Sequence, residues 1–316
     1  SYALFGDALG YWSFFPTVDG RGNLPVWGHA RVLASGHPDV EVGCELYGLM
    51  PMATHLLVAP SAVDRRGFTD ISPHRAQRAE VYNRYLDRST DPLGSGSPNP
   101  DLEALLRPLF TNAFLLEAGL AMDSYHGADA VVITSASSRT ALGAAQLIAS
   151  RDRRPALVGL TRSDHVADVV DFGCFDRVLP YEEASSLPIG PTARIDLSGD
   201  GAVVAAVHRR LGASLVHSSI VGATHRFAEP VDTAALPGAP RTFFIAPEVA
   251  SALSASVGDA AVESALGAAW RAFATQMHTW LRIRRGVGPI EVQSAYRQLL
   301  EGSASPRDGI VLTMRS

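Results

Sequence analysis

Short apolar runs and a helical pattern alternate between residues 128 and 163. Ala130–Thr134 centres on branched apolar residues, which is typical of a strand buried on both faces of a sheet. Small residues follow at 135–138, and 140–150 carries apolar side chains at helical spacing. A second apolar run occupies 155–160. Together they predict one strand–turn–helix–strand unit of a parallel sheet.

The same alternation continues further along the chain. We expect a helix at 164–172, a strand at Arg177–Pro180, a strand at 193–197, a helix at 203–211 and a strand at 214–221. Strands that alternate with helices are typical of a doubly wound α/β domain. We assign that domain to residues 109–245.

The chain before this domain has a β-rich pattern. Short runs at 24–34, 40–49 and 52–58, punctuated by Gly, Pro and Asp, predict a compact antiparallel barrel within residues 1–108. Residues 73–86 predict a helix or an extended excursion, and 101–124 predicts a helix. In the last segment, 246–316, an alanine-rich helix is expected at 249–277, and a closing strand at 309–314 is expected to return to the β-rich part.

Residues 6–15 contain four aromatic side chains, more than an ordinary loop carries. A core strand and turn would explain them. An aromatic wall over a flat ligand is the other interpretation.

Composition narrows the classes of function. The 316-residue chain has a net charge of −5, which argues against a general nucleic-acid or anionic-membrane binder. All 27 basic residues are arginine, so no catalytic lysine exists. Cys44 and Cys174 are too few for a four-thiolate zinc site, and we expect a reduced, cytoplasmic protein. No apolar run approaches the roughly 18 residues of a membrane span. The chain opens at Ser1 without methionine, so we expect it to be trimmed.

The turn after the first buried strand is the candidate phosphate site, because a helix N-terminus offers N–H groups and a positive dipole end. The usual G-x-G-x-x-G positions hold Ala136, Ser138 and Ala141, so the first two glycines are absent. Serine hydroxyls and the helix start can still donate to phosphate, although serines here are often plain caps. The predicted phosphate-binding residues are Ser135, Ser137, Ser138, Arg139 and Thr140.

The end of the second strand indicates which dinucleotide binds. An NAD site usually places Asp or Glu there to bind the ribose 2′-hydroxyl. Here the strand ends in Thr161, Arg162 and Ser163, and no acidic residue comes before Asp164. Arg162 would pair with a 2′-phosphate, and the two hydroxyls would donate to it. The sequence therefore favours NADP over NAD, unless Arg162 is an ordinary loop arginine.

The order of these parts resembles the medium-chain dehydrogenase/reductase superfamily, on its zinc-free quinone-reductase side. The stretches that carry the resemblance include PLFTNAFLL, ADAVVITSASSRTALGAAQLIAS, RIDLSGDGAVVAAVHRRLGASLVHSSIVG and the closing GIVLTM. More specifically, GDALGYWSFFP, PVWGHA, ITSASSRTALG and SIVGATH are similar to a branch known only as a domain of unknown function. The resemblance implies a GroES-like catalytic domain joined to a Rossmann domain, and usually a homodimer.

Zinc ligands are not expected. Zinc-dependent relatives carry a Gly-His-Glu stretch, which is represented here by Gly28, His29 and Ala30. The glutamate and the cysteine ligands are missing, and Cys44 stands alone. We expect a structural role for His29 and no bound metal.

Zinc-free relatives transfer hydride from NADPH to an enone, quinone or carbonyl substrate, and the resemblance implies the same reaction here. The enzyme would position the reactants and stabilise the developing enolate oxygen. Tyr11 is the first candidate donor, and His225, after a strand end, is the second. Contacts to the cofactor are implied for Thr111, Tyr181, Ser198, Gly199, Val221 and Gly222.

Two other readings stay open. The chain could be a weakly catalytic or non-catalytic NADP-binding sensor or scaffold of the same fold. It could also be a hydrolase with a serine nucleophile at 135–138, although no G-x-S-x-G elbow is present.

Overall fold

The computed structural model describes residues 6, 10–17, 22–94, 99–222 and 235–314. The chain divides into two compact units. One consists of Ser1–Arg107 together with Trp270–Ser316, and the other of Pro108–Ala269.

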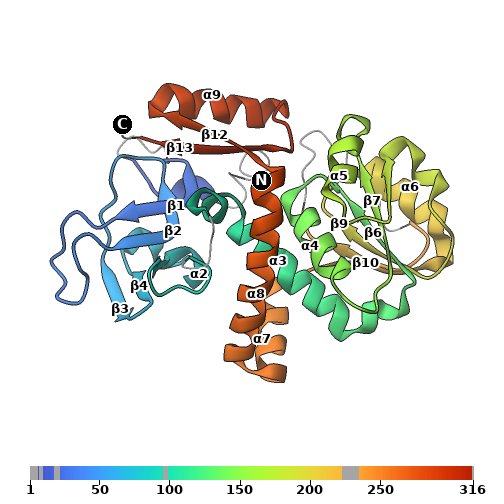
Figure 1. Cartoon of the computed structure of the whole chain (residues 1–316), viewed down its shortest axis with the longest axis horizontal. Coiled ribbons are helices and arrows are strands. Elements are labelled where there is room, and N and C mark those ends of the chain that lie inside the picture. Colours follow the sequence, from blue (N-terminus) through green and yellow to red (C-terminus); the bar gives the residue numbers. More distant parts are fainter. Residues whose placement is uncertain (1–5, 7–9, 18–21, 95–98, 223–234, 315–316) are drawn as a thin grey trace. The chain divides into compact units, whose positions relative to one another are not determined.

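The Pro108–Ala269 unit is built on a six-stranded parallel sheet (Figure 1). Its strands are β6 (Ala130–Thr134), β7 (Ala156–Thr161), β8 (Arg177–Pro180), β9 (Thr192–Asp196), β10 (Leu215–Ile220) and β11 (Arg241–Phe243). They lie in the order β11-β10-β9-β6-β7-β8. This is the Rossmann order, with a reversal between β6 and β9. The doubly wound sheet is confirmed, and β11 is a strand that the sequence did not predict.

Helices cover both faces of this sheet. They are α3 (Pro100–Met122), η3 (Ser124–Gly127), α4 (Arg139–Ala149), η4 (Ser163–His165), α5 (Val166–Phe172), η5 (Tyr181–Ser186), α6 (Gly201–Leu211) and η6 (Gly212–Ser214). Buried side chains of α3 and α4 pack against one face of the sheet, and those of α6 and η5 pack against the other. Helix α4 follows β6 along the chain, so its first turn lies at the carboxyl edge of the parallel sheet.

The other unit contains a five-stranded antiparallel sheet. Its strands are β1 (Pro25–Arg31), β2 (Glu45–Pro51), β3 (Pro60–Asp64), β4 (Gly67–Asp70) and β5 (Arg84–Asp87), in the order β1-β2-β5-β4-β3. Short helices η1 (Tyr11–Ser13), η2 (Pro73–Arg75) and α2 (Glu80–Asn83) accompany it.

Two local predictions in this unit are wrong. Residues 52–58 form no strand, because the run does not alternate between core and solvent and Leu57 is 88% exposed. In residues 6–15 the described part forms the short helix η1 in place of a strand, while Phe14 and Phe15 are buried as expected of core residues.

The C-terminal segment also differs from expectation. A single helix was predicted over 249–277, but the chain forms α7 (Ala246–Val257) and α8 (Asp259–Trp280). They separate at Gly258, whose φ of +84° is left-handed and ends a helix. The closing strand β13 (Asp308–Thr313) belongs to the same compact unit as the antiparallel sheet, but it pairs in parallel with β12 (Arg282–Val287). Helix α9 (Gly288–Glu301) connects this pair.

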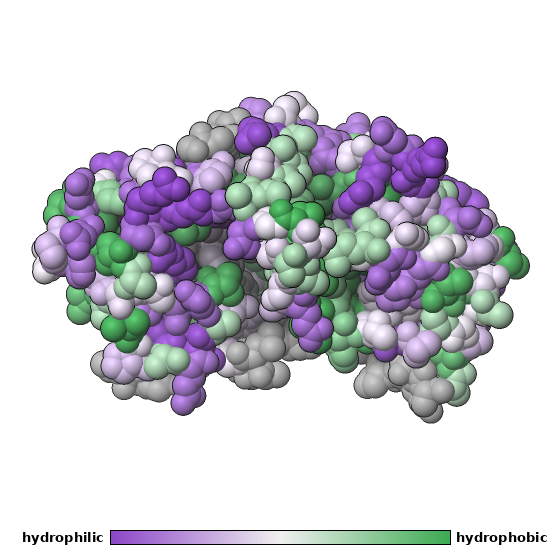
Figure 2. All heavy atoms as spheres, turned by 90° about the horizontal axis from the view of Figure 1, so that it is seen from below, coloured by the Kyte–Doolittle hydropathy of each residue, from purple (hydrophilic) through white to green (hydrophobic). Residues whose placement is uncertain are grey.

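The surface is mixed in character. On the face in Figure 2, hydrophobic residues lie in small groups between hydrophilic ones, as they do on most folded proteins. No helix within the described part of the chain is long and apolar enough to cross a membrane.

Candidate functional site

The carboxyl ends of the central parallel strands meet where the strand order reverses, between β6 and β9. Thr134 ends β6 and Asp196 ends β9, and the Thr134 hydroxyl donates a hydrogen bond to Asp196 Oδ1 over 2.8 Å. Both residues are fully buried. In open α/β sheets, ligands bind outside the carboxyl ends of the strands at this reversal. The residues that follow Thr134 and Asp196 are therefore the candidate ligand site.

The turn after β6 approaches the neighbouring strand closely. Ser135 has a φ of +52°, which is unusual for a residue with a side chain. Ala136 is fully buried against Gly159 of β7, where an added Cβ would lie 2.9 Å from the Cβ of Ala136. The G-x-G-x-x-G motif of dinucleotide-binding folds normally places glycines in the turn itself. Here the glycine on the neighbouring strand provides the space that the turn alanine needs.

Helix α4 begins directly after this turn. Ser138 is its N-cap, and the Ser138 hydroxyl accepts a hydrogen bond from the N–H of Ala141 over 3.3 Å. Arg139 is the first helical residue, and the buried Thr140 is the second. The first N–H groups of a helix have no acceptor inside it, so they and the dipole favour an anion at this end.

Polar contacts from the end of β7, from η4 and from η5 hold the turn. The Tyr181 hydroxyl accepts from the Ser135 N–H over 3.1 Å, and burial raises the pKa of Tyr181 to about 12. Ser137 Oγ accepts from Thr161 Oγ1 over 3.2 Å and lies 3.1 Å from His165 Nδ1. Burial lowers the pKa of His165, which favours the neutral ring.

Arg162 lies at the end of β7, where the sequence analysis expects a contact with the 2′-phosphate, but its guanidinium is paired within the chain. Arg162 Nε and Nη2 donate to the two carboxylate oxygens of Asp164 over 3.0 and 2.7 Å. Partial burial alone would raise the pKa of Asp164, but the hydrogen bond from Arg162 and the charges of His165 and Arg162 outweigh it and lower that pKa. Ser163 donates to Glu182 over 3.2 Å. An acidic residue therefore does compete for Arg162.

Asp196 accepts hydrogen bonds from the other residues that are predicted to contact the cofactor. Its Oδ1 accepts from the Ser198 N–H (3.2 Å), the Ser198 hydroxyl (2.9 Å) and the Gly199 N–H (3.3 Å). Its backbone carbonyl accepts from the N–H groups of Val221 (2.9 Å) and Gly222 (3.2 Å). The loops after β6, β9 and β10 are thus joined through one residue.

The second carboxylate oxygen of Asp196 faces two arginines. Asp196 Oδ2 lies 3.4 Å from Arg194 Nη2 and 3.4 Å from Arg241 Nη2. Arg194 is fully buried in β9, and burial lowers its pKa to about 10. Sequence reasoning missed Asp196, Arg194 and Arg241. The available signal was a pair of opposite charges within a strand buried on both faces, because such charges must be paired.

The remaining predicted site residues lie elsewhere. Thr111 is half-buried on α3 and takes no part in the hydrogen bonds above. His225 falls outside the described residues. Tyr11 belongs to the unit with the antiparallel sheet and is half-buried. Burial raises the pKa of Tyr11, and the electrostatic interaction with the neighbouring Tyr82 raises it further, so the phenol stays protonated.

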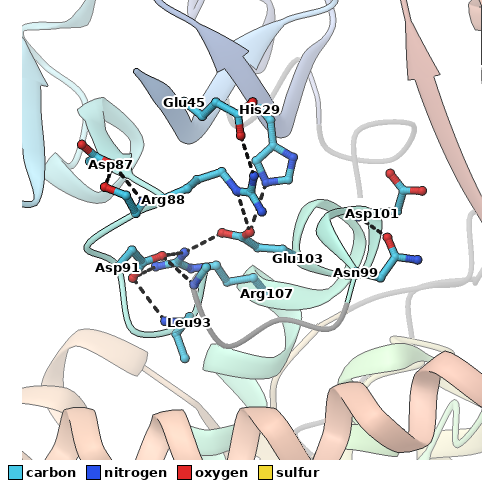
Figure 3. A network of polar contacts seen from close by, with 12 residues as sticks. His29, Glu45, Asp87, Arg88, Asp91, Leu93, Asn99, Asp101, Glu103 and Arg107 are labelled. Carbon is cyan, nitrogen blue, oxygen red and sulfur yellow. Dashed lines mark hydrogen bonds and ion pairs between the residues drawn. The ribbon is translucent and has the colours of Figure 1, made fainter. Parts of the chain in front are cut away.

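The antiparallel unit contains a second polar centre around Glu103, in the first turn of α3 (Figure 3). The fully buried Glu103 carboxylate accepts from His29 Nε2 (3.2 Å), Arg88 Nε (3.2 Å) and Arg107 Nη1 (2.9 Å). Burial alone would raise the pKa of Glu103, but the His29 hydrogen bond and the arginine charges lower it. Asp91 is the second partner of Arg107. Sequence reasoning missed Glu103, which sits in an otherwise ordinary helical pattern.

The described ranges contain no group of three or more His, Cys, Asp or Glu side chains that could hold a metal ion. His29, for which the sequence analysis expects a structural role, contacts Glu103 through Nε2.

The family comparison matches residues 1–305 to the model described as "Protein of unknown function (DUF2855)". No curated protein is significantly similar to the sequence.

Solved structures share the fold at low identity. CurA from Vibrio vulnificus in complex with NADPH is 13% identical, with a TM-score of 0.53, over 95% of this chain and 82% of that chain. The Etr1p/NADP/crotonyl-CoA complex is 12% identical, with a TM-score of 0.51, over 95% and 80%. Bacillus subtilis yhfP with NAD bound is 12% identical, with a TM-score of 0.50, over 92% and 80%. These matches confirm the expected fold, a GroES-like part and a Rossmann part.

Proposed function

The chain belongs to this family of proteins of unknown function, and we propose that it is an NADPH-dependent, metal-independent reductase of enones, quinones or carbonyl compounds. The proposal includes a β-rich catalytic domain at 1–108, a nucleotide domain at 109–245, a cytoplasmic location and a homodimer. Its main support is the carboxyl edge of the parallel sheet. There a helix N-terminus, a cation and several hydroxyl groups follow the first two strands of a Rossmann order.

The residues at this edge fit the parts of NADP. The first turn of α4, with Ser137 and Ser138, would hold the pyrophosphate. Arg162 and Ser163 would hold the 2′-phosphate, and the loop at Ser198 would contact the nicotinamide half. The cofactor supplies the hydride, while the protein orients it and excludes competing reactions. Solved relatives of the same fold contain NADPH or NADP, and one contains NAD.

The Arg162–Asp164 pair does not oppose this assignment. Their side chains are 52% and 56% exposed, and ion pairs this exposed contribute about 0–1 kcal/mol. A phosphate with about two negative charges can therefore draw Arg162 away from one carboxylate at small cost.

The first test is a titration with NADPH and NADH. We expect NADPH to bind at least tenfold more tightly, a difference of about 1.4 kcal/mol. Arg162→Ala should remove that difference and leave NADH binding unchanged. Arg209→Ala, at an exposed arginine of α6, is the matched control and should keep the preference. If neither nucleotide binds, or if Arg162→Ala weakens both equally, the proposal is wrong.

The hydrolase alternative gains one specific observation, the Ser137–His165 contact of 3.1 Å. A serine hydroxyl within hydrogen-bond distance of a histidine ring nitrogen is the start of a nucleophile arrangement. The third member is weak, because Asp164 is 3.8 Å from His165 Nε2 and is already bound to Arg162. A fluorophosphonate that labels Ser137, with labelling lost in His165→Ala, would favour the hydrolase. NADPH binding without NADPH oxidation in the presence of quinones or enones would favour a sensor or scaffold.

A further inference from the structure

Two histidine rings stack on each other within the Pro108–Ala269 unit. The ring centroids of His126 and His217 are 3.8 Å apart, and the angle between the two ring planes is 11°. His126 belongs to the short helix η3, and His217 belongs to strand β10. We call these two residues the histidine stack. It connects two elements that are far apart in the sequence.

Strand β10 places His217 on the face of the parallel sheet that η3 covers. His217 is the register partner of Ala193, and Ala193 belongs to the same buried cluster as Tyr125 of η3. His217 Nε2 lies 2.7 Å from the hydroxyl oxygen of Ser219, which is two residues further along and shares this face of the strand. His217 is half-buried, whereas His126 is exposed. The ring of His126 therefore shields the ring of His217 from part of the surrounding water.

The backbone of η3 is in an unfavourable conformation. Ser124, Tyr125 and His126 have φ angles of +50°, +52° and +56°, and Gly127 follows at +72°. In this left-handed region the Cβ atom lies too close to the backbone, so a run of three residues with side chains costs free energy. Contacts outside the turn must offset that cost. The Tyr125 hydroxyl provides one by donating to Glu117 Oε1 over 2.6 Å, and the histidine stack provides another.

The histidine stack disfavours a second proton. Burial and, after it, the charge of His126 lower the pKa of His217 from its ordinary value of 6.5 to about 4. His217 is therefore neutral at pH 7, and it resists protonation as long as His126 covers it. Two imidazolium rings at this distance would repel each other. When η3 moves away, water reaches the ring of His217 and the like charge is removed, so the released ring binds a proton more readily.

The other charged groups around the stack were compared with this effect. Asp123, directly before η3, favours protonation of His217, but burial and His126 outweigh it. Glu117 of α3 contacts η3 through Tyr125 and is also paired with Arg151. Arg194 and Arg241 are register partners of Ser218, the residue after His217, so they face the opposite side of the sheet. Among the described residues, Asp123 is therefore the acidic group that acts directly on the stack.

We propose that the histidine stack is an acid-sensitive contact, and that protonation of both rings releases η3 from β10. The released turn can leave its left-handed conformation, and this relief favours opening. Ser124 and Tyr125 also line a hollow of about 460 Å³ beside Pro155, so release of η3 opens the amino edge of the sheet to solvent. The candidate ligand site lies at the carboxyl edge, and this inference does not rest on the proposed function.

The size of the effect follows from the pKa of His217. In the released turn the ring regains its ordinary pKa of 6.5, compared with about 4 in the stack. The contact is therefore fully stable above about pH 6.5 and weakens as the pH falls toward 4. Proton linkage between these two values raises the equilibrium constant for opening by about 10- to 30-fold from pH 7.5 to pH 5.

Hydrogen exchange of the whole chain, followed by mass spectrometry, measures this opening locally. The N–H groups of His126 and Ala128 donate to the carbonyls of Asp123 and Tyr125, so their protection reports on η3. After correction for the intrinsic exchange rate, protection of residues 123–128 should fall by about 10- to 30-fold between pH 7.5 and pH 5. His217→Phe keeps a flat ring in the stack but cannot be protonated, so this change should disappear.

Three further variants make the test specific. His217→Gln can still bond to Ser219 and should also lose the pH dependence, so it replaces His217→Phe where that variant does not fold. His126→Phe should reduce the pH dependence without removing it, because the like charge is gone and burial remains. His278→Phe, at an exposed histidine of α8, is the matched control and should behave as the wild type.

A local readout is needed because burial also lowers the pKa values of His165 and His208. Equal protection of residues 123–128 at both pH values would overturn the proposal, and so would an undiminished pH dependence in His217→Gln. An unchanged pH dependence in His126→Phe would assign the effect to burial alone and would overturn the role of the stack. Loss of protection throughout the Pro108–Ala269 unit at pH 5 would indicate global unfolding, which contradicts the release of η3 by itself.

Discussion

Asp196→Asn is the substitution that best separates the two roles of Asp196 at the carboxyl edge of the parallel sheet, as a hydrogen-bond acceptor and as a negative charge. The amide oxygen can still accept hydrogen bonds from Thr134 and Ser198, which lie on the Oδ1 side. The amide NH₂ then takes the place of Oδ2, where it faces Arg194 and Arg241, which are also donors. The substitution therefore removes the negative charge and keeps the size of the side chain.

The magnitude follows from burial. Breaking a buried ion pair by removing one partner costs about 3–5 kcal/mol, because the other charge is left unpaired. Arg241 is 20% exposed and can turn toward water, whereas Arg194 is fully buried and cannot. The long N–O distances of 3.4 Å also indicate weak bonds. We therefore expect a loss of about 3 kcal/mol, the lower end of that range.

Urea unfolding followed by circular dichroism measures this loss. For a unit of this size, the expected loss corresponds to a fall in Tm of about 6–12 °C. Asp152→Asn, at an exposed aspartate of the same unit, is the control and should change stability by less than about 0.5 kcal/mol. NADPH should also bind more weakly to Asp196→Asn, because the loop at Ser198 loses its anchor. A loss below 1 kcal/mol would refute the view that Asp196 is the counter-ion of Arg194.

Two further predictions concern packing and pH. Gly159→Ala should cost about 1–3 kcal/mol, because its Cβ would lie 2.9 Å from that of Ala136, whereas Gly190→Ala, with nothing within 4 Å, should be neutral in the same unfolding assay. A large loss in both variants would show that packing at the turn is not the cause. The hydrogen bonds from Arg154, the largest influence, lower the pKa of Asp176 from 3.8 to about 2. The pair therefore stabilises the fold above about pH 4, and this contribution is lost as the pH falls toward 2. The stability difference between wild type and Asp176→Asn should be below about 1 kcal/mol, because the Arg154–Asp176 pair is partly exposed. This difference should vanish on acidification. A difference that persists at pH 2 would contradict the view that the ionised Asp176 carboxylate is its source.

The parallel sheet could be predicted because its central strands are buried on both faces and its helices have a clear period. Elements without such a pattern were missed. Strand β11 has only three residues, which is too short for any periodicity. Strand β12, with the sequence RIRRGV, carries three arginines and has exposed positions along its length, so it does not resemble a buried strand. Its pairing with β13 is a tertiary effect that local pattern does not contain.

The candidate site also contains parts that the sequence predicted and parts that it did not. The turn at 135–138 and the end of β7 are local features, and the sequence placed both at the carboxyl edge. Asp196 instead joins Thr134, 62 positions earlier, to Arg241, 45 positions later. Glu103 likewise binds His29 across 74 positions. Such centres depend on which strands become neighbours, and that is known only once the sheet order is known.

The preference for NADP that we propose would depend on two residues, Arg162 and Asp164, together. A 2′-phosphate is attracted by Arg162 and repelled by Asp164, while the 2′-hydroxyl of NAD can donate to Asp164. Both groups stand at the same strand end, so the proposed selectivity would depend on the competition of the phosphate and the Asp164 carboxylate for one guanidinium. Because the pair is half exposed, salt screens the attraction of Arg162 for the phosphate. The preference for NADPH should therefore narrow as ionic strength rises, and Asp164→Asn should widen it by releasing Arg162.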